Sequence, residues 1–131
     1  MQRLLTIAGT ALLAMTLQAS AEGDPAKGEK VFKKCAACHA VGENAKNKVG
    51  PQLNGVVDRP WGQVEGYKYS KALIEQGDGQ VWDFENLDVY LTKPKDLIKK
   101  GKMAFAGLRK EDDRVNVIAY LAQFNEDGTT K

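Results

Sequence analysis

The stretch that decides the fold is Cys35-Ala36-Ala37-Cys38-His39, at the end of an expected helix. It holds the only two cysteines and the only histidine in 131 residues. The helix that leads into it is expected to begin at Asp24-Pro25, with Asp24 as N-cap and Pro25 at the first helical position. The thiol and imidazole chemistry of the whole chain is therefore gathered in one short segment.

Four kinds of site can use this spacing. C-x-x-C-H is the attachment signature of a c-type haem, since the two thiols can form thioethers with its vinyl groups and the adjacent histidine can ligate the iron. A disulfide between Cys35 and Cys38 would suit an oxidising compartment. A thioredoxin-like redox pair needs a βαβ setting, and a zinc site needs four ligands where cysteine and histidine total three. The spacing favours haem c attached at Cys35 and Cys38, with His39 as an axial ligand.

Residues 1–21 have the pattern of a secretory signal peptide. Arg3 supplies a positive charge, an apolar stretch follows from Leu4 to Leu17, and Ala19-Ser20-Ala21 is a small-x-small cleavage end. The alternative, an N-terminal anchor helix, is disfavoured because the stretch is shorter than the ~20 residues of a membrane span. We expect cleavage after Ala21 and an exported domain over residues 22–131, in the periplasm of a bacterium.

Met103 is the candidate for the second axial position on the iron. Met1 and Met15 leave with the signal peptide, so Met103 is the only methionine of the mature chain, between Gly101 and Gly107. A lone methionine is more often core filler, but no other histidine is present to compete. Thioether ligation stabilises ferrous iron and raises the potential relative to a second nitrogen ligand.

Helical patterns without strand signals predict an all-α fold. We expect helices over 25–35, over 71–76 after a Ser70 cap, from Asp83, from Pro94, and over 110–124. Residues 41–66 are rich in Gly, Asn, Pro and Lys without a period, which is unusual unless something organises the loop. The sequence therefore predicts about five short helices and long loops wrapped round one covalently bound haem, followed by a loose tail.

The whole mature chain resembles a class I cytochrome c, of the bacterial cytochrome c2 type. The matching positions, in addition to Cys35, Cys38 and His39, are Gly28, Phe32, Gly50-Pro51, Leu53, Gly55-Val56, Arg59, Gly66 to Ser70, Trp82, Tyr90-Leu91, Pro94-Lys95, Lys102 to Phe105, Val117 and Ala119 to Leu121. The chain departs from the pattern at Gly101, where relatives commonly have threonine, and at Asp58, where glycine is usual.

The resemblance implies further roles at the haem pocket. The carbonyl of Pro51 would accept the Nδ1 proton of His39. Tyr90 would lie near the Met103 sulfur, and Gly28 would allow the first and last helices to cross closely. Pro51 would thus act through His39, and Arg59, Tyr69 and Trp82 would act through the haem propionates. The residues implied to support the haem pocket are Pro51, Arg59, Tyr69, Trp82, Tyr90 and Phe105.

Net charge is +2, too balanced for a dedicated nucleic-acid binder. Lysines nevertheless flank both the cysteine motif and Met103, which indicates a basic ring around the exposed haem edge. Such a ring would steer encounters with acidic partners. The lysines expected at this docking surface are Lys33, Lys34, Lys95, Lys99 and Lys102.

Three functions remain to be distinguished. The first is a monomeric, non-enzymatic electron carrier between a cytochrome bc1 complex and either a photosynthetic reaction centre or a cytochrome oxidase, as the resemblance implies. The second is a haem enzyme or gas binder, which would need Met103 away from the iron. The third is a subunit fixed in a larger oxidoreductase. The first is preferred, because two protein ligands restrict the iron to electron exchange.

Overall fold

The computed structural model describes residue 9 and residues 23–131, so the predicted signal peptide and its cleavage site lie outside the described residues apart from Gly9. Five helices follow one another: α1 (Pro25–Phe32), α2 (Lys71–Gln76), α3 (Phe84–Thr92), α4 (Pro94–Leu97) and α5 (Glu111–Leu121). Within the described part of the chain, the only β pairing is two isolated bridges. The expected all-α class with about five short helices is confirmed.

Three helices begin where a capping side chain was expected. The Asp24 carboxylate accepts from the amides of Ala26 and Lys27, Ser70 accepts from Leu73 N, and Asp83 accepts from Asn86 N. These side chains satisfy amides that have no partner within the helix. The predicted starts are confirmed, because the residues that determine them are local.

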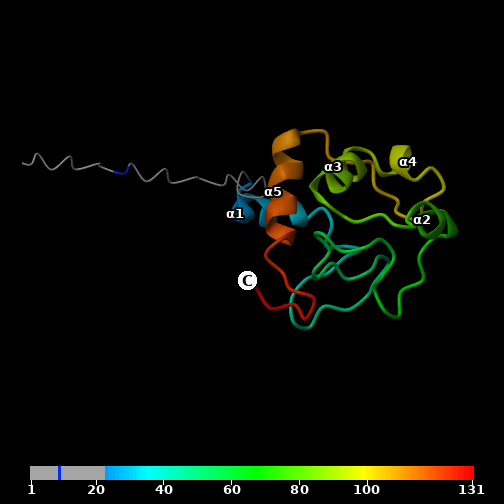
Figure 1. Cartoon of the computed structure of the whole chain (residues 1–131), viewed down its shortest axis with the longest axis horizontal. Helices are drawn as coiled ribbons and strands as arrows, with labels where there is room; N and C mark the ends of the chain where they lie inside the picture. The colour runs from blue at the N-terminus through cyan, green and yellow to red at the C-terminus, as the bar shows by residue number, and fades with distance from the viewer. Residues whose placement is uncertain (1–8, 10–22) are drawn as a thin grey trace, which may run out of the picture.

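Helices α1 and α5 pack across each other at one end of the molecule, as Figure 1 shows. Gly28 permits the crossing, because a Cβ there would collide with the Asn116 carbonyl of α5. The Phe32 ring lies 5.5 Å from that of Tyr120, and Asp24 N donates to Asn116 Oδ1 at 2.8 Å. The expected close crossing at Gly28 is thus confirmed.

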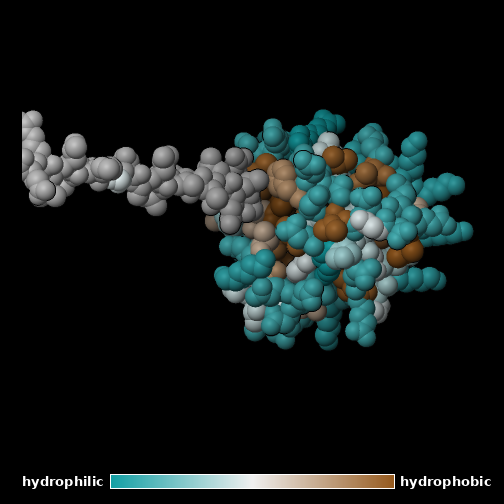
Figure 2. All heavy atoms as spheres, viewed as in Figure 1, coloured by the Kyte–Doolittle hydropathy of each residue, from teal (hydrophilic) through white to brown (hydrophobic). Residues whose placement is uncertain are grey.

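The apolar core joins these helices to α3, α4 and the loops. Val117 and Ile98 are each only 1% exposed. Figure 2 shows a mostly hydrophilic face on which hydrophobic atoms form small separate patches. Across the described residues, no helix has the length and apolar character needed to cross a bilayer.

Side-chain hydrogen bonds to backbone order the long loop after the cysteine motif. Asn54 is 4% exposed; its Oδ1 accepts from Gly42 N at 2.9 Å and its Nδ2 donates to Gly42 O at 2.8 Å. Asn47 similarly accepts from Gln52 N and donates to Glu65 O. The asparagines that gave the segment its loop-like composition are therefore the groups that hold it together.

The C-terminal residues differ from the expected helix and loose tail. Helix α5 ends at Leu121, and Phe124 forms an antiparallel bridge with Thr130. Gly128 is buried at a φ of +87°, where a Cβ would collide with the Gly42 carbonyl. The helix stops early because the chain turns back onto the loop near Gly42.

Candidate functional site

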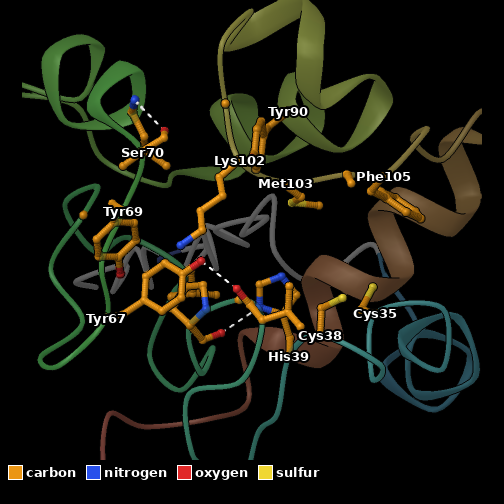
Figure 3. A pocket seen from close by; sticks show the side chains of 18 of the residues that line it. Cys35, Cys38, His39, Tyr67, Tyr69, Ser70, Tyr90, Lys102, Met103 and Phe105 are labelled. Atoms are coloured by element: carbon orange, nitrogen blue, oxygen red, sulfur yellow. Dashed lines mark hydrogen bonds between the residues drawn. The ribbon is translucent and has the colours of Figure 1, made fainter.

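A cavity of about 380 Å³ opens between the cysteine motif, the loops and helices α2 and α3. Figure 3 shows Cys35, Cys38 and His39 on one side of it, and Met103 and Tyr90 on the other. Every residue predicted to hold or support the haem lines this cavity: Cys35, Cys38, His39, Pro51, Arg59, Tyr69, Trp82, Tyr90, Met103 and Phe105. Residues that are widely separated between Cys35 and Phe105 in the sequence thus meet at one site.

The two cysteines lie in tight turns that continue α1. Cys38 N and His39 N both donate to the Cys35 carbonyl, at 3.1 and 2.9 Å. Both thiols are free and half-buried; burial raises the pKa of Cys35, opposed by the nearby Lys34 charge. The described residues contain no group of three His, Cys, Asp or Glu side chains arranged for a metal ion.

His39 is held in one orientation from two directions. Its Nδ1 lies 2.7 Å from the Pro51 carbonyl, so Nδ1–H donates and Nε2 keeps its lone pair. A Cβ on Gly50 would collide with the imidazole ring, so only glycine allows this backbone to approach. Burial lowers the pKa of His39, and the Pro51 hydrogen bond opposes that shift. A neutral, oriented imidazole is the form that ligates a metal.

Met103 lies on a loop that is tied to its surroundings by two lysines. Lys102 Nζ donates to the Lys68 carbonyl at 3.0 Å, and Lys95 Nζ donates to the Gly101 carbonyl. Gly101 N donates in turn to Ile98 O at 3.0 Å. These bonds hold the methionine opposite the cysteine motif.

Polar groups on the cavity wall fit the acidic side chains that a haem carries. Arg59 Nη1 donates to Asn54 O at 2.6 Å, but its buried Nε has no partner among the described residues. The Tyr69 oxygen accepts from Val64 N at 3.0 Å, which leaves the hydroxyl proton free to be donated. A buried donor beside a cavity requires an acceptor, and the carboxylates of haem are acceptors of the right kind.

The apolar part of the wall fits a large flat ring. Tyr90 is half-buried, and this burial raises its pKa to about 12; its ring centre lies 4.9 Å from that of Trp82. Sequence reasoning assigned no role to several further lining residues: Gly50, Val56, Tyr67 and Leu73. Gly50, Val56 and Tyr67 carried a signal only as positions of the family pattern, and Leu73 is an ordinary helix residue without one.

The five predicted docking lysines are all exposed, but they are not equivalent. Lys34 and Lys102 line the cavity. Lys33 is next to Lys34 in sequence, and Lys95 reaches the loop of Met103 through Gly101. Lys99 lies in the segment that leads into that loop.

Comparisons with known proteins agree with this site. Residues 25–125 match the family model described as cytochrome c. The chain is 55% identical over 106 residues to cytochrome c-550 of Ancylobacter novellus, covering 80% of this chain and 99% of that protein. It is 50% identical over 107 residues to cytochrome c2 of Rhodoblastus acidophilus, covering 82% and 98%.

A solved structure gives the same result. The cytochrome c2 from Rhodospirillum centenum superposes with a TM-score of 0.74 at 45% identity, covering 79% of this chain and 99% of that one. A small helical fold built round a C-x-x-C-H motif defines a haem-carrying electron-transfer protein. This chain belongs to the cytochrome c family.

The family settles the cofactor and the general role. One haem c is attached covalently through the cysteines of the C-x-x-C-H motif, Cys35 and Cys38. The chain is a cytochrome c2-like electron carrier and not an enzyme.

Proposed function

We propose that this protein is a periplasmic one-electron carrier whose haem iron is ligated by His39 and Met103. The observation that carries the proposal is their placement on facing sides of one cavity, each on a backbone fixed by hydrogen bonds. Bound haem supplies a one-electron iron couple. The chain itself contributes an imidazole oriented by Pro51 and a thioether held by the Met103 loop.

The polar wall has a supporting role in this proposal. Arg59, Tyr69 and Trp82 bind the haem carboxylates: all three residues line the cavity, and the buried Arg59 Nε has no hydrogen-bond partner among the described residues. Tyr90 and Phe105 cover the apolar part of the ring. With His39 and Met103 both bound to it, the iron would have no ligand position left for a substrate.

Export and partners complete the proposal. Residues 1–21 are removed as a signal peptide, and the mature chain from Glu22 works in the periplasm. Its electron donor is a membrane cytochrome bc1 complex, and its acceptor is a photosynthetic reaction centre or a cytochrome oxidase. The lysines around the cavity guide transient docking of a monomer to acidic faces of these complexes.

Replacing the proposed sixth ligand tests the ligation. Met103→Ala should retain covalent haem by mass spectrometry but bind carbon monoxide or imidazole readily. Its potential should fall substantially, because axial ligands set haem potentials over about 0.8 V. Lys100→Ala, in the same segment, is the matched control. An unchanged potential together with unchanged ligand binding in Met103→Ala would rule out methionine ligation.

The holoprotein also distinguishes the remaining functions. A carrier should resist carbon monoxide, be released as a monomer with the periplasmic contents, and be reduced by membranes that contain the bc1 complex. A haem enzyme or gas binder should bind carbon monoxide as the native protein. A fixed subunit should remain with the membrane fraction.

A further inference from the structure

Two tryptophans are stacked at the edge of the cavity. The rings of Trp61 and Trp82 are 4.2 Å apart between centres and inclined by only 17°. Both side chains are buried, at 6% and 7% exposure. Trp82 lines the cavity and Trp61 does not. Trp61 can therefore act on the site only through its neighbours.

The backbone around Trp61 carries Arg59 and Trp82, the two residues whose side-chain N–H groups are assigned to the haem carboxylates in the proposed function. Asp58 N donates to Trp82 O and Trp82 N donates to Arg59 O, each at 2.8 Å. Pro60 pairs with Val81 in an antiparallel bridge. Residues 58–61 and 80–82 thus form a short ribbon, from which Arg59 and Trp82 reach the cavity.

Trp61 is held between this ribbon and the end of α2. Its amide donates to Gln80 O at 3.1 Å. A Cβ on Gly77, the C-cap of α2, would lie 2.9 Å from the Trp61 Cβ, so the helix end packs closely against it. Trp61 therefore packs between the ribbon and α2 and fixes their relative position.

The indole N–H does not account for a tryptophan at this position. Trp61 Nε1 is buried, and no hydrogen-bond partner for it is present among the described residues. A buried donor without a partner costs free energy. Because Trp61 does not line the cavity, its aromatic surface, stacked on Trp82, is the part of the side chain that connects it to the site.

We propose that Trp61 is a positioning residue that fixes Trp82 and Arg59 toward the haem carboxylates through the stack and the ribbon. The inference rests on the proposed function, which assigns the carboxylates to these donors. Donors held in place favour the ionised carboxylate and keep its pKa low. If the stack is lost, the carboxylate pKa should rise, because the donors are no longer aligned.

The reduction potential reports this change. Ionisation of a carboxylate near the iron adds negative charge, which favours the oxidised state, so the potential falls as pH rises through the carboxylate pKa. In Trp61→Leu that step should move upward by about half a pH unit or more, the size expected from weakening one hydrogen bond. Near-ultraviolet circular dichroism should lose the signal of the coupled indoles.

The controls separate the stack from the N–H and from general stability. Trp61→Phe keeps an aromatic ring and removes the unpaired N–H, so its pH step should stay near the native value. Leu121→Ala weakens the core in α5 at a residue that does not line the cavity, and it should leave the step unchanged. Trp61→Met replaces Trp61→Leu if the latter does not accumulate with haem.

The outcome is decided by potentiometry of the holoproteins across a pH series. An unmoved step in Trp61→Leu, or equal shifts in Trp61→Leu and Trp61→Phe, would overturn the inference. Trp82→Phe, measured in parallel, shows whether a negative result concerns the role of Trp61 or the proposed binding of the carboxylates by Trp82. If Trp82→Phe shifts the step and Trp61→Leu does not, only the role of Trp61 is wrong. If Trp82→Phe also has no effect, the carboxylate role given to Trp82 in the proposed function is wrong.

Discussion

The hydroxyl of Tyr67 donates a 2.7 Å hydrogen bond to the carbonyl oxygen of Val49, and both residues line the cavity; a dashed line at the labelled Tyr67 in Figure 3 marks this bond. The Lys102 ammonium lies 4.9 Å from the centre of the same Tyr67 ring. Val49 precedes Gly50, which packs on His39, and Lys102 precedes Met103. One tyrosine therefore links the backbone beside one proposed ligand to the loop that carries the other.

Tyr67→Phe should loosen this link without removing the ring. The lost hydrogen bond should reduce the free energy of unfolding by about 0.5–1.5 kcal/mol, measured by urea denaturation of the holoprotein. Amide exchange in residues 48–50 should accelerate as well. Tyr120→Phe is the matched control and should change neither quantity, because the Tyr120 ring of α5 packs against Phe32 of α1, away from Val49. Equal effects from both substitutions would show that the Val49 bond contributes nothing specific.

Asp58 is the only non-glycine residue with positive φ in the described part of the chain, at +67°. Left-handed backbone strains residues with a Cβ by about 1–2 kcal/mol, and β-branched side chains suffer most. Asp58→Val should therefore destabilise the protein by about that amount in thermal or urea unfolding, while Asp58→Gly should be neutral or stabilising. Asp78→Val, at an exposed turn position without positive φ, is the control. A similar loss from Asp58→Val and Asp78→Val would contradict the backbone explanation.

Local chemistry explains which parts of the fold were predictable. The starts of α1, α2 and α3 follow from Asp24, Ser70 and Asp83, since a capping side chain acts within three residues of itself. The end of α5 depends instead on the bridge between Phe124 and Thr130, which no periodicity encodes. The sequence therefore predicts these helix starts correctly, whereas it places the ends of the first and last helices three residues too late.

The same distinction holds at the site. The C-x-x-C-H motif is contiguous, and Met103 is the candidate second ligand because it has few competitors, so both stand out on inspection of the sequence. Contacts between loops could not be predicted from the sequence. Tyr67 reaches Val49 across 18 residues of aperiodic sequence, and the partner of Lys102 is a backbone carbonyl, which has no residue identity to detect. The stack of Trp61 on Trp82 likewise requires the pairing of two distant loop segments.

The C-terminal turn should open in acid. The Asp127 carboxylate accepts from the Thr129 amide at 2.9 Å and its hydroxyl at 2.6 Å, and these bonds lower the pKa of Asp127 below its ordinary 3.8. A lowered folded-state pKa means that the stabilisation is present above pH 3.8 and is lost as pH falls through the folded value. NMR shifts of the Thr129 and Gly128 amides should show this step in the native protein.

Asp127→Asn provides the comparison, because an amide oxygen still accepts but does not titrate in this range. The acid step in the NMR shift of the Thr129 amide should disappear in Asp127→Asn. The shifts of the α3 amides should not change with this substitution. An acid step of unchanged midpoint in Asp127→Asn would place the responsible group elsewhere.

The last prediction concerns docking. Lys34 is exposed and lines the cavity, whereas Lys95 and Lys102 also hold the Met103 loop through carbonyls, so reversing either of those would disturb the site. Lys34→Glu is the cleaner probe of charge. It should slow the second-order reaction with an acidic acceptor at low salt. The difference should mostly vanish at high salt, because the Debye length falls from ~30 Å at 0.01 M to ~10 Å at 0.1 M.

Lys110→Glu is the matched control, since it changes the net charge equally at a residue that does not line the cavity. Glu111→Lys makes the opposite change beside it and should also have little effect. Stopped-flow rates across a salt series, with the potential measured for each variant, separate steering from driving force. A rate deficit in Lys34→Glu that persists at high salt would indicate a local contact. Equal deficits in Lys34→Glu and Lys110→Glu would mean that net charge alone steers the encounter and that docking does not centre on the cavity.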